Sequence, residues 1–189
     1  MFLNHYGFDQ KTTKMILPKV IIEKESVRFP FSFTQEEEII FIDKSIKRAK
    51  YGLFVFDPIP GELKSIAYHF ASVYEMLCFI DHNKNDTFHQ CLFVVSALVL
   101  EDKYYDELKK CYPSIIKHNI LISDNIRLIK LSSILSELHL KVFISDTKMI
   151  VQNERKNITY THFRFSKYAK DFKIKPNIKR MNISKFLHK

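Results

Sequence analysis

The stretch that decides the predicted fold is LHLKVFISDTKMIVQNERKN, residues 138–157. His139 and Lys141 are two residues apart, so both point to the same face of a strand, because strand side chains alternate between faces. Phe143 continues that side. A turn at residues 146–148 then lets the chain return as a second strand. We therefore expect a β-hairpin that carries an imidazole and an ammonium side by side at one end.

This pair of side chains is suited to phosphodiester cleavage. A neutral imidazole can attack phosphorus or transfer a proton. An adjacent lysine can hold the phosphate oxygens, whose negative charge grows in the transition state. A surface His and Lys on an edge strand would show the same spacing without any chemical role, so the pattern alone leaves both interpretations open.

The spacing of His139, Lys141 and Asp146 resembles the HxKxxxxD signature of the phospholipase D superfamily. The flanking apolar strands and the turn between them are similar to that motif as well. The family continues with a Gly-Ser-x-Asn segment after the second strand. In this chain Glu154 occupies the Ser position of that segment. Asn157 comes one residue after the Asn position, so a loop with one extra residue would bring Asn157 to that position.

The resemblance implies a metal-independent phosphodiesterase that needs no cofactor and forms a phosphohistidine intermediate. Family active sites are built from two copies of the motif, and this chain carries one, so the resemblance also implies a homodimer with the site across its two-fold axis. His139 would be the nucleophile in one subunit and the general acid in the other. The implied catalytic residues are His139, Lys141, Asp146 and Asn157, with Asn153 as the substitute for Asn157 and Asp171 in the place of a downstream glutamate.

Positive charge is concentrated at the C-terminal end of the chain. The net charge is +9, and residues 164–189 hold nine Lys or Arg against the single acid Asp171. Interleaved with Tyr168 and Phe172, such a segment is typical of a surface that binds nucleic-acid phosphates. A solvated or partly disordered tail is the alternative. The candidate nucleic-acid-binding residues are Arg164, Lys167, Lys170, Lys173, Lys175, Lys179 and Arg180.

The remaining chain predicts a mixed α/β fold, in which helices flank both faces of a central mixed β-sheet. The segment Thr34–Glu37 has the pattern of a helix-capping box, and isoleucines follow at helical spacing, which predicts a helix over about residues 35–50. The other expected elements are strands within 15–33, 53–56, 91–100 and 119–123, and helices at 61–82 and 102–118. We expect three parts: N-terminal strands at 1–33, a phospholipase D-like domain at 34–163 and the basic segment at 164–189.

Several classes of protein are disfavoured by the composition. No run approaches the roughly 18 apolar residues that a membrane helix requires, and residues 1–6 lack the features of a signal peptide. The histidines between residues 69 and 89 lack the close spacing of zinc ligands. Three cysteines in apolar surroundings, Cys78, Cys91 and Cys111, are expected to be buried thiols rather than a disulfide framework. We therefore expect a cytoplasmic protein without a metal, a cofactor or a membrane partner.

The predicted function is cleavage of nucleic acid by a small endonuclease, with DNA favoured over RNA as the substrate. The alternative is a non-catalytic nucleic-acid-binding or interaction protein that keeps a degenerate phospholipase D-like fold. Glu154 favours this alternative, because it would place a negative charge near the bound phosphate.

Overall fold

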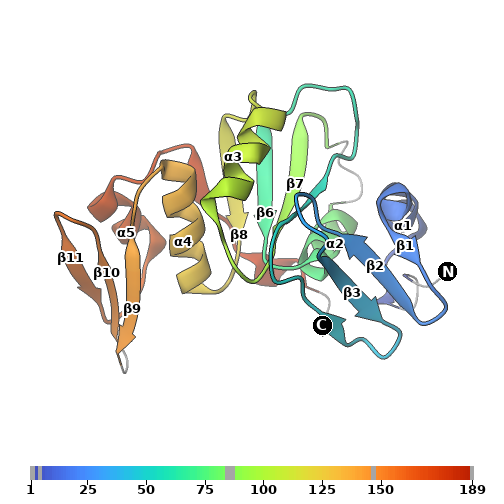
Figure 1. The fold of residues 1–189 in the computed structure, drawn as a ribbon, viewed down its shortest axis with the longest axis horizontal. Helices are drawn as coiled ribbons and strands as arrows, with labels where there is room; N and C mark the ends of the chain where they lie inside the picture. The colour runs from blue at the N-terminus through green and yellow to red at the C-terminus, as the bar shows by residue number, and fades with distance from the viewer. Residues whose placement is uncertain (1–2, 4–5, 84–87, 146–147, 188–189) are drawn as a thin grey trace.

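The computed structural model of the protein describes residue 3 and residues 6–83, 88–145 and 148–187. Within those residues the chain forms three β-sheets that follow one another along the longest axis, with helices between and beside them (Figure 1). The central sheet has the strand order β12-β8-β6-β7-β5. Its strands are β5 (Leu53–Phe56), β6 (Ile66–Phe70), β7 (Cys91–Ser96), β8 (Lys117–Leu121) and β12 (Ile178–Arg180).

The central sheet is mixed and is buried on both faces. Strands β6, β7, β8 and β12 are parallel, and β5 is antiparallel to β7. Helix α2 (Val73–His82) packs on one face against Phe70 and Phe93, and helices α3 (Asp102–Cys111) and α4 (Asn125–Ser136) pack on the other against Val94 and Ile120. All six residues of β7 are buried, as the continuous apolar run predicted. The expected mixed sheet with helices on both faces is therefore confirmed, whereas its likeness to phospholipase D stays a prediction.

The N-terminal sheet contradicts the helix expected at residues 35–50. Its order is β1-β2-β3-β4, formed by β1 (Ile21–Ile22), β2 (Ser26–Pro30), β3 (Glu37–Phe41) and β4 (Ile46–Lys47). Alternate residues Glu38 and Ile40 are buried, while Ile42 and Ile46 of the predicted helical stripe are exposed. The helix prediction was wrong because β2 offers a pairing partner along the whole of β3, and tertiary pairing overrides local pattern.

Local hydrogen bonds account for two further differences near the N-terminus. The hydroxyl oxygen of Thr34 accepts from the amide of Glu36 at 3.2 Å, so it closes a turn before β3 and caps no helix. The expected strand at residues 15–17 is wrong as well. Helix α1 (Gln10–Ile16) occupies that region, because the carboxylate of Asp9 accepts from the amide of Thr12 at its N-terminus.

Two helices are shorter in the structure than the sequence predicted. Residues 66–70 of the expected helix 61–82 form β6, which lies between β7 and β8, and α2 begins only after its cap Ser72. A central strand is buried on both faces, so its apolar residues also fit a helical pattern. The expected helix 102–118 ends at Cys111, two residues before Pro113. Cys111 is exposed, against expectation, whereas Cys78 and Cys91 are buried thiols as predicted.

The hairpin expected at residues 138–157 is present, but it lies outside the central sheet. Strands β9 (Lys141–Ser145), β10 (Lys148–Gln152) and β11 (Asn157–Tyr160) form a separate antiparallel sheet of order β11-β10-β9, here called the third sheet. It stands at the end of the molecule farthest from α1, with α4 between it and the central sheet (Figure 1). Helix α5 (Phe165–Phe172) packs beside it.

The basic segment is folded up to residue 187, which contradicts the disordered-tail alternative. It contains α5, the strand β12 of the central sheet and a short 3-10 helix at Ile183–Lys185. Strands β2 and β3, which lie on either side of the boundary expected between residues 33 and 34, pair with each other. None of the helices within the described ranges combines the length and apolarity needed to cross a membrane.

Candidate nucleic-acid interface

The third sheet has one face that packs on the core and one that is directed away from it, and Ile144 at the hairpin end of the packing face is itself 59% exposed. Val151 in β10 is fully buried and pairs with Val142 in β9 and Ile158 in β11, so these residues define the face that packs on the core. Side chains alternate along a strand, so their neighbours form the opposite face, here called the outer face. The outer face carries Lys141, Phe143, Ser145, Lys148, Ile150, Gln152, Asn157 and Thr159.

Strand register arranges the outer face in rows. Lys141, Gln152 and Asn157 lie directly opposite one another across the three strands. Two residues further along, Phe143 begins the next row, and its side chain is 48% exposed. Neighbouring strands are about 4.8 Å apart, so the backbones of Lys141 and Asn157 are roughly 10 Å apart. The structure therefore places two predicted catalytic residues on one face, with Gln152 between them.

His139 lies just before β9, between α4 and the third sheet, and is exposed. It lines two shallow hollows. One, of about 320 Å³, also contains Asn153 and Glu154, and the other, of about 280 Å³, contains Lys141 and Lys130 of α4. The predicted pair is therefore together in one hollow. Lys130 joins it from α4, the helix that directly precedes β9, and strand alternation alone does not predict this contact.

The other residues that the resemblance implied are placed differently. Asp146 lies outside the described residues. The side-chain oxygen of Asn153 accepts from the amides of Arg155 and Lys156 at 3.0 and 2.8 Å, so it is used by the turn between β10 and β11. Asn157 is exposed on the outer face. Of the two asparagines, only Asn157 shares a face with Lys141.

Asp171 joins α5 to the buried side of the third sheet, and it lines neither of the two hollows of His139. Its carboxylate accepts from the hydroxyl of Tyr160 at 2.8 Å, and its backbone carbonyl accepts from the ammonium of Lys156 at 2.7 Å. Burial, followed by this hydrogen bond, raises the pKa of Tyr160. Asp171 therefore makes structural contacts between α5 and the third sheet, and its role in the place of a downstream glutamate stays a prediction.

The seven basic candidates of the C-terminal segment are all exposed but lie on separate elements. Lys167 on α5 stands over the ring of Tyr160, on the buried side of the third sheet, with its ammonium 5.9 Å from the ring centre. Lys179 and Arg180 belong to β12, at the edge of the central sheet. The others lie at the start of α5 (Arg164), within it (Lys170), at its left-handed end (Lys173) and beyond it (Lys175). They are therefore distributed over several elements, and among them Lys175 contacts Glu137, which lines one of the hollows of His139.

A cluster of charges, of which Glu38 is buried and Arg48 and Arg127 are half-buried, closes the carboxyl ends of the parallel strands, where open α/β sheets commonly bind ligands. Glu38 accepts from the amide of Val73 at 2.8 Å and lies 3.4 Å from the guanidinium of Arg48. Arg127 donates to the carbonyls of Ser96 and Ala97. These side chains bind the backbone at the strand ends and hold α2 and α4 against the sheet.

Comparison of the chain with protein-family models, with curated proteins and with solved structures found no match.

Proposed function

We propose that the protein binds single-stranded nucleic acid on the outer face of the third sheet. The observation that carries the proposal is the exposed ring of Phe143, which shares that face with Lys141 and Lys148. An unpaired base can stack on an exposed aromatic ring, and lysines beside it can bind the phosphates that flank the base.

Polar side chains on the same face support this proposal. Gln152 and Asn157 stand in the row beside Phe143, and Thr159 stands opposite Ile150 on the neighbouring strand. Their amide and hydroxyl groups can bond to base edges or to phosphate oxygens. A duplex hides its base faces in the stack, so this face favours a single strand.

Fluorescence anisotropy with a labelled single-stranded oligonucleotide tests the proposal. Stacking contributes about 1–3 kcal/mol per base, so Phe143→Ala should weaken binding roughly 5- to 150-fold. Leu63→Ala is the control, because Leu63 is a 77% exposed apolar residue in the segment before β6 of the central sheet and is not part of the third sheet. Equal affinities for the wild type and Phe143→Ala would place the interface elsewhere. Parallel titrations with DNA, RNA and a duplex identify the preferred strand.

A metal-independent endonuclease is the second candidate function. It is favoured by the shared hollow of His139 and Lys141, which Lys130 also lines together with the acid Asp102. This mechanism needs a second copy of the chain, since one chain carries one such pair. Glu154 in the adjoining hollow opposes it, because its carboxylate would repel a phosphate.

Cleavage of labelled single- and double-stranded substrates in excess EDTA separates the two candidates. If the protein is the predicted nuclease, the wild type cleaves, His139→Ala does not, and the control His162→Ala, at another exposed histidine, cleaves normally. Sedimentation would then give the mass of a dimer. If the wild type binds these substrates without cleaving them, the result supports nucleic-acid binding rather than cleavage as the function.

A further inference from the structure

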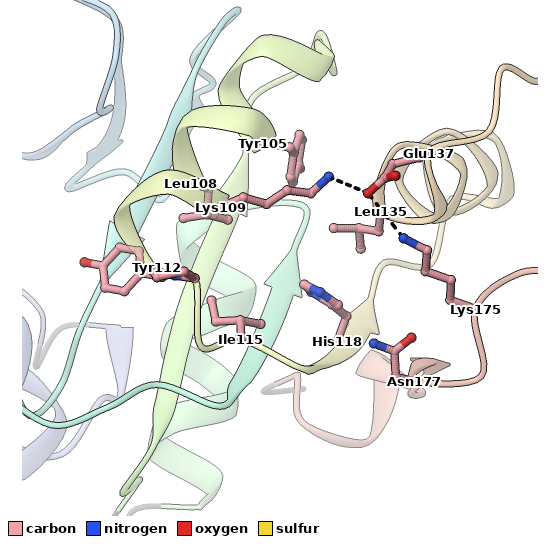
Figure 2. A pocket seen from close by; sticks show the side chains of 11 residues that line it. Tyr105, Leu108, Lys109, Tyr112, Ile115, His118, Leu135, Glu137, Lys175 and Asn177 are labelled. Atoms are coloured by element: carbon pink, nitrogen blue, oxygen red, sulfur yellow. Dashed lines mark hydrogen bonds and ion pairs between the residues drawn. The ribbon is translucent and has the colours of Figure 1, made fainter.

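A pocket of about 370 Å³ opens between α3, the C-terminal end of α4 and the segments that lead into β8 and β12. Apolar side chains form much of its wall, among them Leu108, Ile115 and Leu135 (Figure 2). Its volume lies within the range of small-molecule sites. It shares no residue with the outer face of the third sheet, so it is independent of the proposed nucleic-acid interface.

A pair of histidines lies behind the pocket. His118 lines the pocket, and its Nδ1 is 3.0 Å from Nε2 of His69, which is fully buried. Burial lowers the pKa of His69 far below its ordinary value. The pKa of His118 is lowered to about 4 by burial and by the charges of Lys109 and Lys175. Both imidazoles are therefore neutral near pH 7.

The pair has a preferred arrangement of protons. Nδ1 of His69 is buried and has no hydrogen-bond partner among the described residues. If His69 carries its proton on Nε2 and donates it to His118, its buried Nδ1 has only an unused lone pair. If His69 instead carries its proton on Nδ1, that N–H is buried without an acceptor, which proteins avoid more strictly. His118 then accepts at Nδ1 and carries its own proton at Nε2. The pocket wall thus presents an N–H donor.

Two lysines stand at the mouth of the pocket and share one carboxylate oxygen. The ammonium groups of Lys109 and Lys175 lie 3.1 and 3.3 Å from Oε1 of Glu137 (Figure 2). Lys109 is also 4.0 Å from Asp106. The side chain of Glu137 is 65% exposed, and exposed ion pairs contribute only about 0–1 kcal/mol. A ligand anion can therefore replace Glu137 between the two lysines at little cost.

We propose that this pocket binds a small organic anion, a phosphate or carboxylate group on an aromatic or branched apolar body. The anion lies between Lys109 and Lys175 in the place of the Glu137 carboxylate. The apolar body contacts Leu108, Ile115 and Leu135. Nε2–H of His118 donates to the ligand from the floor of the pocket.

Isothermal titration with phenyl phosphate and with phenylacetate tests the proposal, and a comparison of the two identifies the preferred anion. Benzyl alcohol is the neutral control, and inorganic phosphate is the control without an apolar body. We expect binding of at least one of the two anions at millimolar or lower concentration, at least 10-fold tighter than either control. Binding of that anion should also move the side-chain nitrogen resonances of His118 in NMR spectra.

Variants distinguish a built site from a general attraction of anions to a basic protein. Lys109→Gln and Lys175→Gln should each weaken binding, whereas Lys103→Gln, an exposed lysine of α3 outside the pocket, should not. Glu137→Gln should tighten binding about two- to five-fold, because it removes the internal competitor. A melting curve confirms that each variant is folded. Failure of both anions to bind, equal binding of a control ligand or weaker binding by Glu137→Gln would overturn the proposal.

Discussion

The buried histidine pair makes the stability of the protein depend on pH. The pKa of His118 is about 4 in the folded protein, against an ordinary value of 6.5. Between these values the unfolded chain binds a proton that the folded chain does not, so acid favours unfolding. The contribution of His118 is therefore fully present above about pH 6.5 and is lost as the pH falls towards 4. His69, with its lowered pKa, acts in the same direction.

The magnitude follows from the two pKa values of His118. Their difference, 6.5 minus about 4, corresponds to about 3 kcal/mol over the whole range. About 2 kcal/mol of this is lost between pH 7 and pH 4.5, where protonation of the folded ring is still incomplete. The ring lies near other titratable groups, namely Lys109, Lys175, Glu137 and His69. The two proteins that are compared should therefore differ only at residue 118, so that these groups are present in both.

His118→Asn is the informative variant, because its side chain can still offer a polar atom near Nε2 of His69 but does not titrate. The free energy of unfolding of both proteins is measured by urea denaturation at several pH values from 7 to 4.5. We expect the wild type to lose about 2 kcal/mol relative to His118→Asn across this range. A difference between the two proteins that stays constant with pH would refute the assignment of a lowered pKa to His118.

Three more predictions concern the core, the buried acid and the interface. Phe93 is fully buried in the central sheet, so Phe93→Ala should lower the free energy of unfolding by about 3–5 kcal/mol in urea; a cost below about 1 kcal/mol would mean that the ring is not packed as described. Burial raises the pKa of Glu38 from 4.5 to about 7, so its contribution is present below pH 4.5 and is lost as the pH rises through 7. Relative to Glu38→Gln, the wild type should therefore gain stability from pH 7 to 4.5, opposite in sign to the effect of His118; a loss over that range would contradict the raised pKa. Replacement of Lys141 and Lys148 by Gln should reduce the salt dependence of single-strand binding by about 1.4 in log–log slope, and an unchanged slope would show that neither lysine contacts phosphate.

The opposite signs of Glu38 and His118 have a consequence for the wild type. Acid protonates both groups, but it stabilises the fold at Glu38 and destabilises it at His118 over nearly the same pH range. The free energy of unfolding of the wild type therefore changes less with pH than either contribution would by itself. Only the comparison with the matched variants separates them.

Part of the candidate interface was predictable from the sequence. The period-two pattern that puts His139, Lys141 and Phe143 on one side is a local property, and strand register confirms it for Lys141 and Phe143. The row that includes Asn157 depends on how β11 pairs with β10, and sequence spacing does not give that register. The place of Lys130 depends on how α4 packs against β9, and the pocket around His118 depends on contacts between elements far apart in the chain, for which the sequence holds no local signal.

The sequence by itself indicated the strand at residues 91–96 and the hairpin of β9 and β10, because short runs rich in β-branched and aromatic residues are typical of strands and a turn-forming segment separates the two strands of the hairpin. Only the tertiary structure decided that residues 37–41 and 66–70 are strands, since each is stabilised by partner strands that local patterns do not reveal. It also decided that the hairpin stands apart from the central sheet and that the basic segment adds an edge strand to it. Burial and strand pairing are properties of the whole chain, and they select among conformations that the local sequence leaves nearly equal in energy.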